Sequence, residues 1–157
     1  MISRYTRPDM GRIWSDQNRF EQWLEVELAA SEALAELGVV PPEAARLLRE
    51  HAAVDAARVL EIEKTVKHDV IAFTTTVAES MQRAGHADAS RWLHYGLTSN
   101  DVVDTAQALM LDQASILLID GVERLREILK RRALEFKHTV QIGRTHGVHA
   151  EPVTFGL

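Results

Sequence analysis

The sequence contains no cysteine, which excludes disulfide bonds, thiolate metal sites and a cysteine nucleophile, and which favours a reducing compartment. Proline is absent from residues 43–151, and glycine is sparse there. The 157 residues are nevertheless 46% hydrophobic, so a disordered or low-complexity chain is also excluded. Length and composition together predict one domain with a substantial core.

Long apolar runs are also scarce. We identify no run that approaches the roughly 20 residues of a membrane span, and the opening residues lack the apolar core of a signal peptide. The net charge of -5, without a basic stripe, argues against binding to nucleic acid. We therefore expect a cytoplasmic protein with no membrane and no nucleic-acid partner. Glycine-rich nucleotide loops and the serine-hydrolase motif G-x-S-x-G are missing as well.

What the chain does have is helical periodicity, rich in Ala, Leu, Glu and Arg. The predicted helices are one between Asp16 as N-cap and Gly38, one opening at Pro42, one from Asp55 through Ile62, one from His68 or Asp69 to Gly85, and one from Asp101 to Lys137. The fold class is all-α. A family resemblance, given below, implies a helical N-terminal domain over residues 1–110 and the start of a central helix bundle over residues 111–157.

The last predicted helix is about 55 Å long at 1.5 Å per residue, so it needs neighbours along most of its length. Residues 138–157 change character and predict a loop with a short extended piece, after which Pro152 can begin another helix. The sequence stops at Leu157 straight after this polar segment. We expect the chain to be a part of a longer protein.

Polar residues able to do chemistry gather at three breaks between helices. The first break is RTHGVHAE, residues 144–151, where His146 can move a proton and Arg144 can hold an anion. A loop whose histidines cap backbone groups explains the same residues. Zinc at His146, His149, Glu151 and His138 is disfavoured because the helical H-E-x-x-H form is absent, so we expect no metal.

The second break is LHYGLTSND, residues 93–101. Thr98 and Ser99 precede a long helix whose free N–H groups favour a carboxylate or phosphate. Simple helix capping accounts for these residues equally well. The third break is KHDV, residues 67–70, which taken alone reads as an ordinary helix start. Arg4 and Tyr5 in the N-terminal arm add a basic and aromatic pair suited to an anionic ligand, although exposed terminal arginines are common.

These segments together resemble the adenylosuccinate lyases of the fumarase/aspartase superfamily. The resemblance is carried by SRYTRPDMGRIWSDQNRFEQWLEVELAASEALAELGVVP, LEIEKTVKHDVIAF, HYGLTSNDVVDTA and GRTHGVHAEPVTFGL. It implies a lyase that cleaves a C–N bond and releases fumarate. The implied substrates are adenylosuccinate, which gives AMP, and the succinylated aminoimidazole carboxamide ribotide of purine biosynthesis. The resemblance implies a homotetramer and no cofactor.

The resemblance also assigns roles to residues. His146 is implied to be the general acid at the leaving nitrogen, and His68 to lie close to the reaction. The implied substrate-binding residues are Arg4 and Tyr5 for the phosphate, Lys67, His68 and Asp69 for the nucleotide part, His94 for orientation, Thr98 and Ser99 for the succinyl carboxylate, and Thr145 beside the acid. The family's general base lies on a serine-rich loop outside this sequence, so we expect the chain alone to be inactive.

Two other interpretations remain open. One is a non-catalytic helical module whose long helix associates with copies of itself. It would oligomerise without binding nucleotide. The other is a different fumarate-releasing lyase of the superfamily, and competition between AMP and argininosuccinate for binding would separate the two lyases.

Overall fold

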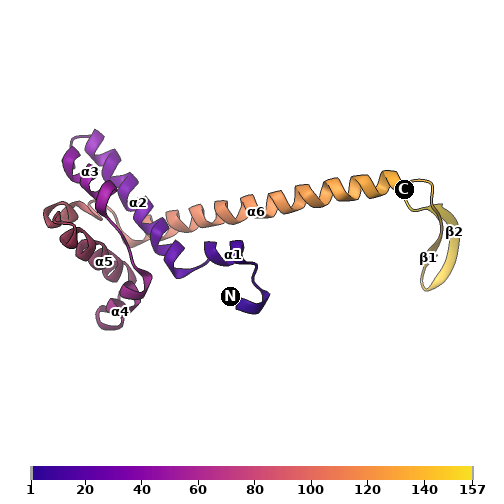
Figure 1. Cartoon of the computed structure of the whole chain (residues 1–157), viewed down its shortest axis with the longest axis horizontal. Coiled ribbons are helices and arrows are strands. Elements are labelled where there is room, and N and C mark those ends of the chain that lie inside the picture. The colour runs from indigo at the N-terminus through magenta and orange to yellow at the C-terminus, as the bar shows by residue number, and fades with distance from the viewer. Residues whose placement is uncertain (1, 157) are drawn as a thin grey trace. The chain divides into compact units, whose positions relative to one another are not determined.

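The computed structural model describes residues 2–156 of the chain. They form two compact units, the first ending at Ala114 and the second beginning at Ser115. Figure 1 labels the α-helices and β-strands. The elements are η1 (Ser3–Tyr5), α1 (Pro8–Ile13), α2 (Asp16–Glu36), α3 (Pro42–His51), α4 (Ala56–Val66), α5 (Asp69–Arg83), η2 (Ala87–Trp92), α6 (Ser99–Glu135), β1 (Val140–Thr145) and β2 (Val148–Thr154). The predicted all-α class is confirmed, with one two-stranded sheet added.

Helices α2 to α6 match the five predicted helices, with differences at their ends. Helix α2 begins after Ser15 rather than after Asp16, because the Ser15 hydroxyl accepts the N–H of Asn18 at 3.2 Å and so acts as the N-cap. Helix α4 follows Asp55, whose carboxylate accepts the N–H of Ala57 at 2.9 Å. Helix α1 was not predicted, because six residues starting at Pro8 are too few to show periodicity.

The core of the first unit is built around three aromatic rings. Phe20 and Trp23 of α2 meet at 5.2 Å between ring centroids, and Phe73 of α5 lies 5.5 Å from Trp23 and 6.3 Å from Phe20. All three side chains are buried. Helices α2 and α3 pack together, as do α4 and α5 (Figure 1). This core fixes the starts of α5 and α6, where most of the predicted site residues lie.

Helix α6 changes its environment along its length. In the first unit it buries one narrow stripe of residues four apart, Val102, Ala106, Met110 and Ala114. In the second unit its large apolar side chains are exposed: Ile116, Leu118, Ile119, Val122, Leu125, Ile128, Leu129 and Leu134. A helix with apolar residues on most sides needs partners, as the sequence predicted. The predicted domain boundary near residue 110 stays a prediction.

By length and composition, α6 is also apolar enough to cross a membrane. The expectation that no segment would qualify is therefore wrong. The same test is passed by helices in the core of globular proteins, so it is weak evidence for a membrane. Asp104 and Asp112 lie within the apolar part of this helix, and a charge at the centre of a membrane helix costs about 2.5–3.5 kcal/mol. The composition fits burial among other helices better than contact with lipid.

The predicted loop over residues 138–157 contains a β-hairpin. Strands β1 and β2 are antiparallel, and Val140 pairs with Thr154 while Thr145 pairs with Val148. The pairing shifts between Ile142 and Arg144. The expectation that Pro152 begins a helix is wrong, because Pro152 lies within β2 opposite Ile142. A proline at this place is compatible with a strand in a two-stranded sheet, which has open edges.

Candidate active site

His94 is held by a buried carboxylate. It lies in the connection between η2 and α6, with a backbone φ of +61°. Its backbone N–H donates to Glu27 Oε2 at 2.7 Å, and its ring Nδ1 lies 2.6 Å from Glu27 Oε1. The Glu27 side chain is fully buried, whereas the His94 side chain is 27% exposed. Glu27 could not be predicted as a site residue, since a single glutamate within an amphipathic helix gives no signal of burial.

At the start of α6, the donors of Thr98 are already engaged. Asp101 Oδ2 accepts the Thr98 backbone N–H at 2.7 Å and the Thr98 hydroxyl at 3.0 Å. These two bonds, the backbone one first, lower the pKa of Asp101 against the smaller effect of desolvation. Ser99 is the first residue of the helix and is half-buried. The spacing T-x-x-D is a capping-box pattern, so the sequence did contain a signal for Asp101.

The segment Lys67–Asp69 connects α4 to α5. Lys67 ends α4 with a φ of +56°, and His68 is the N-cap of α5, its Nδ1 accepting the N–H of Ile71 at 3.4 Å. Asp69 is the first residue of α5, and its Oδ1 accepts the adjacent Val70 N–H at 2.8 Å. The side chains of His68 and Asp69 are 44% and 51% exposed. The ring of His68 is thus oriented by a capping bond yet accessible to a ligand.

In the N-terminal arm, the guanidinium carbon of Arg4 lies 4.8 Å from the centre of the Tyr5 ring. Both side chains are exposed, Tyr5 at 73%. The Thr6 hydroxyl donates to the carbonyl of Ile2 at 2.8 Å, which closes this short turn. The stacked pair presents a cation and an aromatic face together, an arrangement that suits a phosphate or a flat ring.

The residues Thr145 and His146 belong to the second unit. His146 and Gly147 form the two-residue loop of the hairpin, with φ values of +49° and +74°. Two positive φ values are what a type I′ hairpin turn requires, and glycine at the second position is favoured there. The imidazole of His146 is exposed at the tip of the hairpin. His149 lies within β2, opposite Arg144, rather than in the turn.

Three of the predicted site residues share an unusual backbone conformation. Among residues 2–156, the residues other than glycine with positive φ are Lys67, His94 and His146. Such conformations are uncommon outside glycine and often occur at functional sites. Within the same residues there is no group of three or more His, Asp or Glu side chains placed to hold a metal ion.

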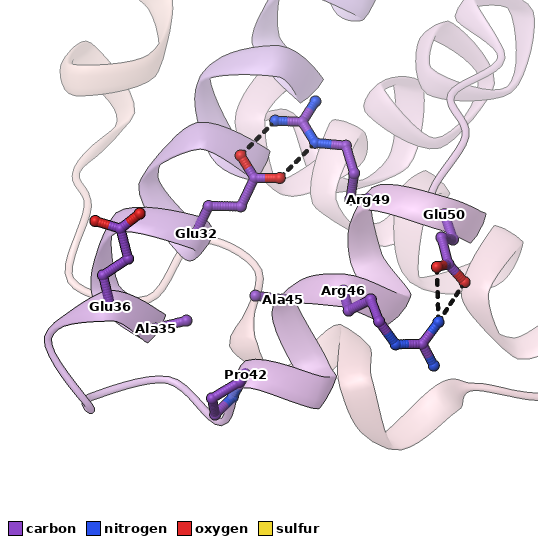
Figure 2. A pocket seen from close by; sticks show the side chains of 8 residues that line it. All are labelled: Glu32, Ala35, Glu36, Pro42, Ala45, Arg46, Arg49 and Glu50. Atoms are coloured by element: carbon purple, nitrogen blue, oxygen red, sulfur yellow. Dashed lines mark hydrogen bonds and ion pairs between the residues drawn. The ribbon is translucent and has the colours of Figure 1, made fainter.

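A groove of about 450 Å³ between α2 and α3 is lined by none of the predicted site residues. It has an apolar floor of Ala35, Pro42 and Ala45, flanked by arginine and glutamate side chains (Figure 2). Arg49 donates to Glu32 at 2.7 and 2.8 Å, and this pairing lowers the pKa of Glu32. Because the guanidinium groups are paired internally, the groove presents no free cation to an anionic ligand among the residues that line it.

Comparison with known proteins decides the family. The family described as "Lyase" matches residues 3–157 of the chain. The chain belongs to this lyase family.

Two curated relatives of this chain are bacterial adenylosuccinate lyases. The chain is 55% identical to the one from Bacillus subtilis and 49% identical to the one from Staphylococcus saprophyticus, each over 157 residues. Each comparison covers 100% of this chain and 35% of the relative. The lyase chain therefore spans about a third of the length of the curated relatives that it matches.

Solved structures resemble the lyase chain as well. A fumarate lyase from Mesorhizobium has a TM-score of 0.82 at 30% identity, with 94% of this chain and 34% of that chain covered. The 3-carboxy-cis,cis-muconate lactonizing enzyme from Pseudomonas putida has a TM-score of 0.86 at 30% identity, with 98% and 36% covered. The fold predicted from the family resemblance is thereby confirmed.

Proposed function

We propose that this chain forms the N-terminal part of an adenylosuccinate lyase. The complete enzyme would cleave the C–N bond of adenylosuccinate to give fumarate and AMP, and would act in the same way on the succinylated aminoimidazole carboxamide ribotide. The observation that carries the proposal is the 55% identity to the Bacillus subtilis adenylosuccinate lyase over the whole of this chain. The fold and the positions of the polar residues support it.

The chemistry asks for two kinds of group that this chain can supply. Negative charge builds on the succinyl carboxylate as the neighbouring C–H proton leaves, and the departing nitrogen must receive a proton. We assign proton donation to His146, whose exposed place at the hairpin tip leaves its ring accessible. Thr145, directly before it, would contact the substrate. The general base would come from a part of the enzyme outside this chain.

We assign the succinyl carboxylate to Thr98 and Ser99 at the start of α6. Asp101 now accepts both Thr98 donors, so a substrate carboxylate would have to replace the Asp101 carboxylate there. Helix α6 is long and begins at this point, so its N-terminal N–H groups favour either anion. Asp101 then acts as an internal substitute that keeps the donors of Thr98 paired when no substrate is bound.

The nucleotide contacts are assigned to the other exposed residues of the first unit. Arg4 and Tyr5 would bind the phosphate with the cation and the aromatic ring. Lys67, His68 and Asp69 would contact the nucleotide part, and His94 would orient the substrate. The proposal requires no metal and no organic cofactor.

We further propose that the complete enzyme is a cytoplasmic homotetramer assembled through α6. The exposed apolar residues of its second half support this, because a row such as Leu118, Val122, Leu125 and Leu129 follows the alternating four- and three-residue spacing of helices that pack in bundles. Helices from other copies would cover these residues.

The experiment compares His146→Gln with His149→Gln in a full-length lyase that carries this segment. Fumarate release from adenylosuccinate is followed by ultraviolet absorbance, and AMP binding by calorimetry. Loss of a general acid lowers kcat by about 10²–10⁴-fold. The His149 variant, changed in the same hairpin but outside the turn, should keep normal turnover. Near-normal kcat in the His146 variant would contradict the acid assignment.

The alternatives give different results in the same assay. A helical assembly module would oligomerise without binding AMP. A different superfamily member, such as a relative of the muconate lactonizing enzyme, would be inactive toward adenylosuccinate at every concentration. The 157-residue chain alone should release no fumarate, and turnover comparable to that of the complete enzyme would refute the dependence on an external base.

A further inference from the structure

Glu27 is the only buried charged side chain among residues 2–156. It lies in the middle of α2 beside the core residues Trp23, Leu24 and Leu28, and none of its side chain is exposed. Burying a carboxylate is unfavourable unless its oxygens are well paired, and an apolar residue generally serves a core at least as well. Packing alone therefore does not explain a glutamate here.

Both oxygens of this carboxylate are directed to one residue, 67 positions further along the chain. Oε2 accepts the backbone N–H of His94 at 2.7 Å, and Oε1 lies 2.6 Å from the ring Nδ1. The first bond supports a backbone with φ at +61°, which residues other than glycine seldom adopt. The second contact involves the ring of His94 and does not support its backbone conformation. It fixes the orientation of the imidazole.

The pairing also determines where the ring carries its proton. An ionised carboxylate only accepts hydrogen bonds, so with Glu27 in that form the short contact requires a proton on Nδ1. This leaves Nε2 as the ring nitrogen available to a ligand. His94 is held close to the start of α6, because it lies four residues before Thr98 and its backbone carbonyl accepts the N–H of Leu97 at 3.5 Å.

We propose that Glu27 is a positioning residue that presents Nε2 of His94 to an anionic oxygen of the substrate at the start of α6. The inference rests on the proposed function, which supplies the anionic substrate. With the first proton on Nδ1, a second proton taken from solvent by Nε2 gives the imidazolium form of His94, whose charge the ionised Glu27 carboxylate balances. The Nε2–H of this form donates a charge-assisted hydrogen bond to a carboxylate or phosphate, which is roughly twice as strong as a neutral one.

The first test reads the tautomer of His94 by ¹⁵N nuclear magnetic resonance in the 157-residue chain, at a pH where the ring is neutral. The wild type should carry its proton on Nδ1. In the Glu27→Gln variant, the backbone N–H of His94 can only donate, so the single side-chain amide oxygen must accept it. The amide NH₂ group then faces Nδ1 of His94. The ring proton should therefore move to Nε2. An unchanged Nδ1–H form in this variant would overturn the proposal.

The second test measures KM and kcat in a full-length lyase carrying the segment. Glu27→Gln should raise KM by about 10–100-fold, by analogy with the loss that follows removal of the partner that orients a metal-binding histidine. In a His94→Gln background, the same change should have no further effect, since Glu27 acts through the ring. An equal factor in both backgrounds would mean that Glu27 only stabilises the fold, and would refute the inference.

Ser31→Ala provides the matched control, because Ser31 lies one turn further along α2 and is 3% exposed. This variant should leave both the His94 tautomer and KM unchanged. The two proposals fail separately. A wild-type enzyme that releases no fumarate from adenylosuccinate would refute the proposed function, while the tautomer measurement still decides the role of Glu27.

Discussion

Phe73 gives the sharpest test of how the core supports the proposed site. Its side chain has no exposed surface, and its ring lies against Phe20 and Trp23. The same helix, α5, starts directly after His68. Replacing Phe73 should therefore reduce the stability of the first unit and loosen the segment proposed to bind the nucleotide.

The size of the effect follows from burial and ring geometry. Phe73→Ala removes a fully buried ring and should lower the free energy of unfolding by about 3–5 kcal/mol. Phe73→Leu keeps most of the apolar volume but loses two aromatic contacts, each worth about 0.5–1.5 kcal/mol, so a loss of about 1–3 kcal/mol is expected. Ile71→Ala is the control, because Ile71 is 49% exposed on the same helix, and its effect should stay within about 0.5 kcal/mol.

The assay is urea unfolding of the 157-residue chain, followed by circular dichroism and by tryptophan fluorescence, to which Trp23 beside Phe73 contributes together with Trp14 and Trp92. Both variants should shift the unfolding transition to a lower urea concentration, Phe73→Ala further than Phe73→Leu. A loss below about 1 kcal/mol for Phe73→Ala, or equal losses for Phe73→Ala and Ile71→Ala, would refute the assignment of Phe73 to the centre of the core.

Three further predictions concern the surface. The pKa of Asp101 is lowered by its hydrogen bonds from Thr98. The amide resonance of Thr98 should therefore titrate with a midpoint below the usual aspartate value of about 3.9, because the cap is lost as the pH falls through that midpoint. Asp101→Asn should abolish this titration. Gly147→Ala should destabilise the hairpin by roughly 1 kcal/mol because of its positive φ, and unchanged cross-strand nuclear Overhauser effects would contradict this. Arg49→Leu, which breaks a half-exposed pairing with Glu32, should cost no more than about 1 kcal/mol in thermal unfolding. That cost should shrink in 1 M salt, where the Debye length is about 3 Å.

The helices could be predicted because their signals are local. Asp55 and the apolar spacing of α2 and α5 are visible in a window of a few residues, whereas the cap of α2 was placed one residue late, at Asp16 instead of Ser15. The hairpin was missed because its register depends on pairing across the chain, as between Ile142 and Pro152. The proline, read as a helix start, has the same fixed φ in an edge strand.

The candidate site was predictable in its residues but not in its pairings. The polar breaks containing His68, His94 and Thr98 were identified from the sequence, partly through family resemblance. The buried partner of His94 could not be, because Glu27 is 67 residues away and looks like any other glutamate on an amphipathic helix. Asp101 could have been found, since its capping pattern is local.

The left-handed backbone at Lys67, His94 and His146 has a consequence for protein engineering. A left-handed residue other than glycine costs about 1–2 kcal/mol, so these positions are where a change to glycine relieves the most backbone strain. Lys67→Gly should therefore raise the melting temperature, since Lys67 follows the end of α4 and makes no buried contact there. Selection of variants for heat resistance alone would enrich such changes, and would remove the proposed ligand contacts before it altered the core.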